Sequence, residues 1–126
     1  MRRPFTRFLR SEDGGISVEY SIWMVAMTLM LMMSADASML LYKHAQLYDV
    51  SRDMARSVAT GTLTQEEAAA LLNRFRDPEN YRHTVTTDGT FITTTVTVDF
   101  GDVLIFGGTF LTGRQLEGRV VMASEV

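Results

Sequence analysis

Residues 14–35 read GGISVEYSIWMVAMTLMLMMSA, and this stretch decides how the rest of the chain is organised. It carries a single charge, Glu19, and residues 20–35 carry none. Because an α-helix rises about 1.5 Å per residue, residues 16–35 would span roughly 30 Å, the thickness of the hydrocarbon core of a bilayer. The stretch therefore predicts a transmembrane helix, which we assign to residues 15–37, with an acid near its start.

The residues before this helix are basic. Residues 1–14 carry four arginines against Glu12 and Asp13, a net charge of +2, and since the whole chain has a net charge of −3, the remainder has −5. Basic residues beside a membrane helix mark its cytoplasmic side. We therefore expect a single-pass protein with its N-terminus in the cytoplasm and residues 38–126 as a small domain on the far side of the membrane.

The junction between leader and helix carries a motif. The basic leader ends in Gly14, and Glu19 and Tyr20 follow after four intervening residues that begin with Gly15. This arrangement resembles type IV prepilins of the Flp/Tad class, in which a prepilin peptidase cuts after the glycine. In that family the glutamate is the fifth residue of the mature chain and an aromatic is the sixth. The resemblance implies cleavage between Gly14 and Gly15, which places Glu19 fifth and Tyr20 sixth.

The rest of the chain is similar to small pseudopilins of the TadE/TadF kind, in which a modest α+β domain follows the anchor helix. The resemblance implies a minor pilin that helps to assemble a Tad (Flp) type IV pilus from the inner membrane. Its partners would be the prepilin peptidase, other Tad pilins or pseudopilins, the inner-membrane assembly platform and the lipid bilayer. TadE-like sequences more often have Phe after the glutamate, whereas Glu-Tyr, as in Glu19-Tyr20, is typical of major Flp pilins. The length of the chain instead favours the TadE/TadF kind, because major Flp pilins are little more than the helix. The choice between TadE and TadF, and whether the protein enters the fibre, stay open.

Two other interpretations of the N-terminal segment stay open as well. The first is a secretory signal with a small-x-small cleavage site at Ala35-Asp36-Ala37. Glu19 argues against it, because the core of such a signal is uncharged. The second is an uncleaved anchor that carries a periplasmic accessory or sensor domain.

Glu19 has a different role in each interpretation. Without cleavage it is an interfacial acid one turn into the helix. With cleavage, its carboxylate can pair with the new amine at Gly15, on the same or a neighbouring subunit, since ionisable groups within membranes usually pair.

A single long helix is predicted beyond the membrane stretch, because no proline or glycine occurs between residue 16 and Gly61. Its second half is amphipathic, and Gly61 is a natural C-terminal stop. We expect the helix to run from about Ile16 to Ala59, with Asp36 at the outer boundary of the membrane. Its apolar stripe recurs at spacings of three, four and seven residues and consists of Leu40, Leu47, Val50, Met54 and Val58.

A second, short helix should follow. Thr64-Gln65-Glu66-Glu67 has the form of a capping box. The helix should continue through Phe75 and end before Asp77-Pro78, because proline cannot continue it. Its Ala/Leu face should pack back against the amphipathic half of the first helix.

From Tyr81 onward the pattern is typical of strands. Asp88-Gly89 suits the tight primed turn of a hairpin between a strand that ends at Thr87 and one that begins at Thr90. Apolar and polar residues then alternate twice, as expected for half-buried strands. The two inward-facing sets are Ile92, Thr94, Val96, Val98 and Phe100, and Leu116, Gly118, Val120 and Met122. The predicted fold class is α+β: a long N-terminal helix, transmembrane then amphipathic, a short second helix and an antiparallel sheet of about three strands.

The segment from Val103 to Leu111 is strongly apolar and contains Ile105, Phe106 and Phe110. An exposed apolar patch usually marks an interaction site, so these three residues are candidate partner contacts. The equally favoured alternative is that they close the end of the small sheet.

Several functions are not expected. The chain has no cysteine, so it has no disulfide and no thiolate metal site. Its two histidines, His44 and His83, do not form a metal-ligand cluster, so we predict neither a metal nor another cofactor. The acidic remainder offers no groove for nucleic acid. No catalytic motif is present, so we do not expect an enzyme.

Overall fold

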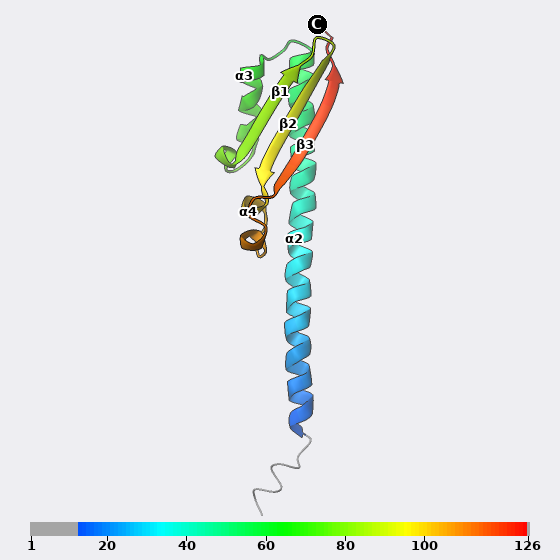
Figure 1. Cartoon of the computed structure of the whole chain (residues 1–126), viewed down its shortest axis with the longest axis vertical. Helices are drawn as coiled ribbons and strands as arrows, with labels where there is room; N and C mark the ends of the chain where they lie inside the picture. The colour runs from blue at the N-terminus through cyan, green and yellow to red at the C-terminus, as the bar shows by residue number, and fades with distance from the viewer. Residues whose placement is uncertain (1–12, 126) are drawn as a thin grey trace, which may run out of the picture. The chain divides into compact units, whose positions relative to one another are not determined.

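The computed structural model describes residues 13–125, so most of the predicted leader lies outside the described residues. The α+β class is confirmed, with one long helix, a short second helix and a three-stranded antiparallel sheet (Figure 1). The elements in chain order are α2 (Asp13–Ala59), α3 (Gln65–Ala68), η1 (Ala69–Arg74), η2 (Pro78–Asn80), β1 (Tyr81–Thr87), β2 (Phe91–Asp99), α4 (Phe100–Val103), η3 (Gly108–Phe110) and β3 (Gln115–Ala123).

The chain forms two compact units, Met1–Ser34 and Ala35–Val126. Helix α2 contributes its first turns to the first unit and its remaining turns to the second. The helix includes Asp13, three residues earlier than the predicted start, and ends at Ala59 as predicted. Gly61 supplies the predicted stop, because it adopts a φ of 67°, which other residues rarely adopt.

The second helix is tighter than predicted. Its start is as expected, since the Thr64 hydroxyl accepts from the Glu67 N–H and the Glu67 carboxylate accepts from the Thr64 N–H. The Thr64 N–H and hydroxyl hold the pKa of Glu67 below its usual value. The predicted second helix is present from Gln65 to Arg74, one residue short of Phe75, but only α3 is α-helical and η1 is a 3-10 helix. In η1 the tighter winding brings residues three apart to the same side, and Leu72 and Phe75 are both buried.

The three strands follow one another in the sheet in the order β1-β2-β3, with both neighbours antiparallel. Strand β1 ends at Thr87 and β2 begins at Phe91, so residues 88–90 form the loop of the hairpin. The predicted two-residue primed turn was therefore wrong. A type I′ turn needs positive φ at both central residues, but in the described part of the chain positive φ occurs only at glycines, and here only Gly89 has it, with 67°.

The predicted alternation of the strands is confirmed for most positions. Along β2 the buried side chains are those of Ile92, Thr94, Val96 and Val98, while Phe100 leaves the strand and begins α4. Along β3, Gly118 and Val120 are buried, and Glu117, Arg119 and Val121, which alternate with them, are exposed.

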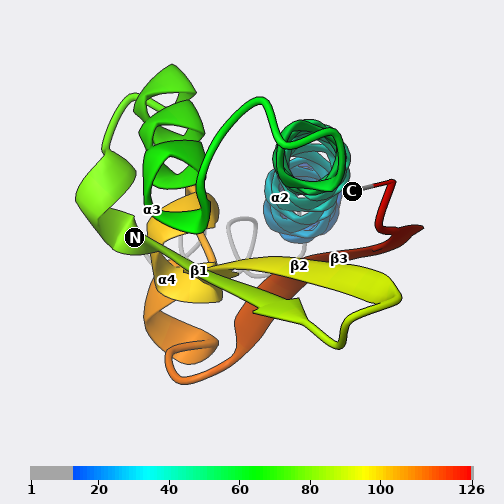
Figure 2. The same ribbon diagram turned by 90° about the horizontal axis from the view of Figure 1, so that it is seen from above.

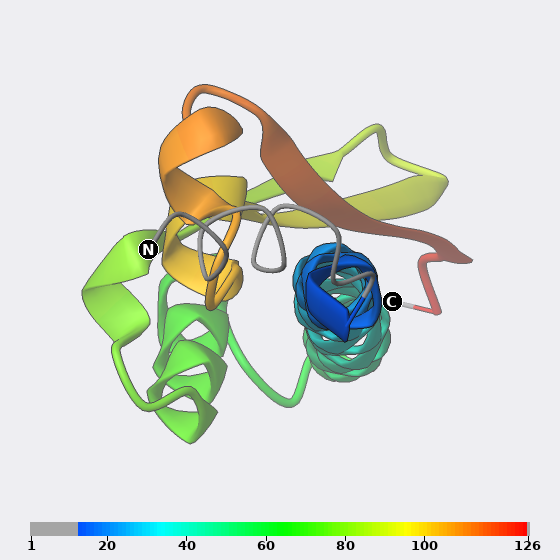
Figure 3. The same cartoon turned by 90° about the horizontal axis from the view of Figure 1, so that it is seen from below.

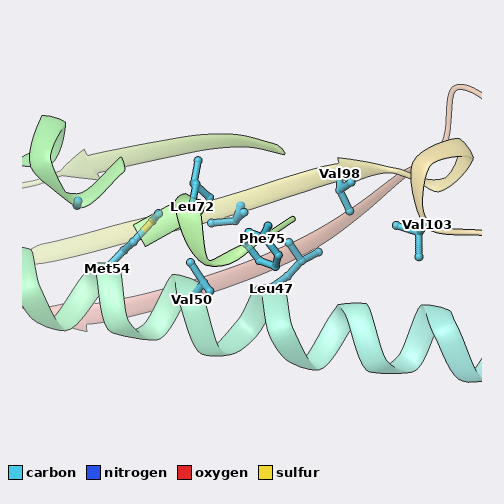
Figure 4. Packing of buried hydrophobic residues seen from close by; sticks show 9 residues of the cluster. Leu47, Val50, Met54, Leu72, Phe75, Val98 and Val103 are labelled. Atoms are coloured by element: carbon cyan, nitrogen blue, oxygen red, sulfur yellow. The ribbon is translucent and has the colours of Figure 1, made fainter. Parts of the chain in front are cut away.

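Helices α2 and α3 lie on the same face of the sheet (Figure 2). Leu47, Val50 and Met54 point from α2 toward the strands (Figure 4), as the apolar stripe predicted. Complete burial of one such side chain contributes about 1.5–3 kcal/mol to stability. The core cluster consists of Leu47, Val50, Met54, Ala68, Leu72, Phe75, Val96, Val98 and Val103.

Helix α2 and strand β3 approach each other very closely at Gly118. A Cβ atom placed on Gly118 would lie 2.7 Å from the carbonyl carbon of Leu47 and 2.9 Å from its oxygen. On the next turn of α2, the buried Ser51 hydroxyl donates a 2.8 Å hydrogen bond to the Gly118 carbonyl oxygen. Helix and strand are thus in backbone contact, and only a residue without a side chain fits at this position.

Candidate functional site

Helix α2 is the one helix in the described part of the chain that is long and apolar enough to cross a membrane. An 18-residue window in it has a mean hydropathy of 1.7, and none of that window is buried inside the structure. A core helix of a globular protein would instead be covered by its own chain. Most of the large side chains in the described part of the first unit are exposed. They include Tyr20 and Trp23 near the N-terminal end of the apolar stretch, and aromatic rings favour membrane interfaces.

Two polar side chains within the apolar stretch bond to backbone of their own helix. The Ser21 hydroxyl donates to the Ser17 carbonyl oxygen at 2.8 Å, and the Thr28 hydroxyl donates to the Met24 carbonyl oxygen at 2.8 Å. In a bilayer, where water is absent, such bonds remove the penalty of an unsatisfied hydroxyl. The stretch is therefore compatible with lipid on all sides.

The predicted processing residues, Gly14 and Gly15, lie in the first turn of α2. Nothing lies within 4 Å of the point where a Cβ on Gly15 would stand. Glycine weakens a helix by roughly 0.5–1 kcal/mol relative to alanine. Two consecutive glycines therefore make this turn easy to unwind.

Glu19 lies four residues after Gly15, and residues four apart share a face of an α-helix. Its side chain is exposed, and among the described residues no side chain forms an ion pair with it. An amine created at Gly15 would therefore lie one turn away on the same face as an unpaired carboxylate. Tyr20, the next residue, is 66% exposed.

The apolar segment from Val103 to Leu111 is divided between core and surface. Val103 is 3% exposed and belongs to the core cluster. In contrast, Ile105 is 62% exposed, Phe106 50% and Phe110 89%. These three side chains are exposed and so do not close the end of the sheet. They belong to the segment that joins β2 to β3, whose backbone is drawn in Figure 3.

Asp36 holds this segment in place. One carboxylate oxygen, Oδ1, accepts hydrogen bonds from the N–H groups of Ile105 at 2.9 Å and Phe106 at 3.0 Å. The other oxygen, Oδ2, accepts from the Gly107 N–H at 2.7 Å. A Cβ on Gly107 would lie 3.0 Å from that same oxygen. Three consecutive backbone donors thus bind one carboxylate of α2.

This role of Asp36 was missed in the sequence, where the residue was interpreted only as the outer boundary of the membrane. A signal for it was present. Asp36 is the only charged residue from Tyr20 to Tyr42, and an isolated charge in a long uncharged helix usually has a partner. The partner could not be identified, because it consists of backbone groups about 70 residues away.

A polar hollow of about 170 Å³ lies where β2 leads into α4, and it is lined in part by Arg82, Asp99 and Asp102. It contains neither a histidine nor a serine or cysteine nucleophile. Among the described residues, no group of three or more His, Cys, Asp or Glu side chains could hold a metal ion. His44 and His83 are both exposed.

No protein-family model, curated protein or solved structure matches this chain. Its function must therefore be argued from the N-terminal motif, the apolar helix and the contacts of the domain.

Proposed function

We propose that this protein is a minor pilin (pseudopilin) of a Tad/Flp-type type IV pilus, anchored by α2 and cut by a prepilin peptidase between Gly14 and Gly15. The observation that carries the proposal is the position of Glu19. It is the only charge in residues 14–35, it has no partner among the described residues, and it lies one turn from Gly15 on the same helix face.

Cleavage would give the Glu19 carboxylate a charged partner. Ionisable groups within membrane helices usually pair with another group. Hydrolysis of the bond after Gly14 creates a positively charged amine at Gly15, and it also makes Gly15 the new start of the helix. A carboxylate near a helix N-terminus is favoured by the helix dipole. Both effects stabilise the mature helix start, in one subunit or between neighbours.

The domain supports a structural role for the protein in the assembly. It is a small α+β unit built from one helix half, a second helix and three strands. In this proposal the basic leader keeps the N-terminus in the cytoplasm, the inner membrane holds α2, and the domain lies in the periplasm. The protein acts as a substrate of the peptidase and as a partner of other Tad pilins and of the assembly platform.

The mature N-terminus tests this proposal. We expect peptide mass spectrometry of the protein extracted from membranes of its host to identify Gly15 as the first residue. A chain that starts at Ser38 would identify a secretory signal instead. A chain that retains Met1 would identify an uncleaved anchor with an accessory or sensor domain.

A second prediction concerns Glu19. The variant Glu19→Ala should still insert and be cleaved, because it removes a charge from an apolar helix. Its recovery with other pilins should fall by roughly tenfold or more, since the Gly15 amine loses a charge-assisted partner. The measurement is quantitative co-purification from crosslinked membranes, with Glu117→Ala, an exposed acid of β3, as the control. Normal recovery of Glu19→Ala would contradict the pairing with the Gly15 amine and would identify Glu19 as an interfacial acid.

A further inference from the structure

The exposed apolar residues of the β2–β3 connection are held next to Asp36, near the end of the uncharged stretch of α2. Asp36 is separated from the last residue of the first unit, Ser34, by one residue. It is also the first charge after the uncharged residues 20–35. Because the Asp36 carboxylate binds the backbone of residues 105–107, that backbone is held beside the residue that directly follows the uncharged run.

The backbone of this connection is suited to an environment with little water. The N–H groups of residues 105–107 donate to Asp36. Those of Leu104, Phe110 and Leu111 donate to carbonyl oxygens of the same connection, at 3.0, 3.0 and 3.3 Å. Non-helical backbone near the hydrocarbon region is tolerated only where its polar groups are satisfied within the protein. Six donors of this short connection meet that condition.

The side chains complete the pattern. Residues 103–113 carry no charge, and their large exposed apolar side chains are those of Ile105, Phe106 and Phe110. Apolar and aromatic groups of this kind enter the boundary between lipid headgroups and acyl chains. The carboxylate of Asp36 can lie at that boundary because it accepts three hydrogen bonds there.

We propose that Ile105, Phe106 and Phe110 insert into the outer interface of the lipid bilayer that α2 spans, with Asp36 setting their depth. This inference rests on the part of the proposed function that places α2 in a membrane, and it is independent of cleavage and of pilus assembly. A protein partner would also accept these side chains. A bilayer is favoured because the connection is held at the boundary of the membrane stretch itself.

Tryptophan fluorescence in lipid vesicles tests the contact. The full chain is reconstituted in vesicles of phosphatidylethanolamine and phosphatidylglycerol, with or without brominated acyl chains that quench tryptophan. Since Trp23 is the only tryptophan, a Trp23→Phe background accepts a single new probe. Phe110→Trp reports on the connection. Phe91→Trp is the control, because Phe91 is also an exposed phenylalanine but begins β2, roughly 26 Å along the nine-residue strand from α4.

We expect Phe110→Trp to emit at shorter wavelength than Phe91→Trp, and its quenched fraction in brominated vesicles to be several times larger. Equal quenching of the two probes, with Trp23 of the unaltered chain quenched, would overturn the lipid contact while the anchor stands. The apolar residues would then face a protein. If Trp23 itself is not quenched, α2 is not inserted, and both the anchor and this inference fail.

The role of Asp36 has its own measurement. Asp36→Ala removes the acceptor of three N–H groups, so the quenching of Phe110→Trp should fall toward that of Phe91→Trp. Asp49→Ala, which removes an exposed acid from the same helix, should leave it unchanged. The Asp36→Ala chain that retains Trp23 shows whether insertion persists. Unaltered quenching of Phe110→Trp in the Asp36→Ala chain would show that Asp36 does not set the depth.

Discussion

Replacement of Gly118 by alanine is expected to destabilise the domain by about 3 kcal/mol or more, at the upper end of the usual range for overpacking. The new Cβ would meet the Leu47 carbonyl carbon at 2.7 Å and the Leu47 Cβ at 2.8 Å. The carbonyl carbon belongs to the backbone of a helix, and the Leu47 Cβ is bonded directly to that backbone. Neither atom can rotate away as the end of a flexible side chain does. Strand β3 would have to move off α2, and the buried hydrogen bond from Ser51 to the Gly118 carbonyl would break with it.

This loss is large for a unit of roughly 90 residues, whose total stability is on the order of 5–14 kcal/mol. Hydrogen exchange measured by mass spectrometry on the full chain in detergent reports this loss of stability. Peptides from β2 and β3 can be followed separately from those of the membrane helix. We expect their protection to fall by at least a hundredfold in Gly118→Ala, since each 1.4 kcal/mol corresponds to a factor of ten.

The matched control is Gly101→Ala in α4. There the new Cβ would meet Thr112 Cγ2 at 3.6 Å and the Gly108 carbonyl oxygen at 3.7 Å, which are ordinary contacts. Its protection should match that of the unaltered chain or exceed it slightly, because alanine is the better helix former. Equal protection in Gly118→Ala and Gly101→Ala would show that helix and strand are not in backbone contact at Gly118.

The second large effect is expected at the proposed cleavage site. Gly14→Leu should leave nearly all of the protein as uncut precursor, because the peptidase must accommodate the side chain beside the bond that it hydrolyses. Leucine also strengthens the first turn of α2 by removing one of its two glycines, so the segment unwinds less readily. Intact mass and N-terminal peptides of the membrane-extracted protein measure the effect.

Gly15→Ala is the control on the other side of the same bond. It also strengthens the helix turn, and its Cβ meets nothing within 4 Å. We expect it to be cut, so a block limited to Gly14→Leu would assign the effect to the scissile position and not to helix stability. A mature start at Gly15 in the Gly14→Leu chain would show that the proposed site is wrong.

The helices and strands were predictable to different degrees. The stripe of Leu47, Val50 and Met54 identified the buried face of α2, because a repeat of 3.6 residues is visible in the sequence itself. The 3-10 winding of η1 was not predictable, since an Ala/Leu run is compatible with either helix and packing of Leu72 and Phe75 distinguishes them. The hairpin was predicted at the right place but with too short a loop.

The N-terminal part of the candidate site consists of residues that are close together in the sequence. Gly14, Gly15, Glu19 and Tyr20 lie within seven residues, and helix geometry alone relates Glu19 to Gly15. The exposure of Ile105, Phe106 and Phe110 was not readable. Val103, in the same apolar segment, is buried, and composition does not separate the members of one apolar run.

The sequence by itself determined the long helix and its membrane-compatible first half. It also determined which faces of the strands are buried, and therefore the α+β class. Each of these features follows from the pattern of apolar and polar residues a few positions apart. Only the tertiary structure decided that Gly118 contacts the backbone of Leu47 and that Asp36 binds residues 105–107. Both contacts join residues about 70 positions apart along the chain. Periodicity shows which face of an element is apolar, but the distance to a partner and the identity of that partner follow from how the whole domain packs.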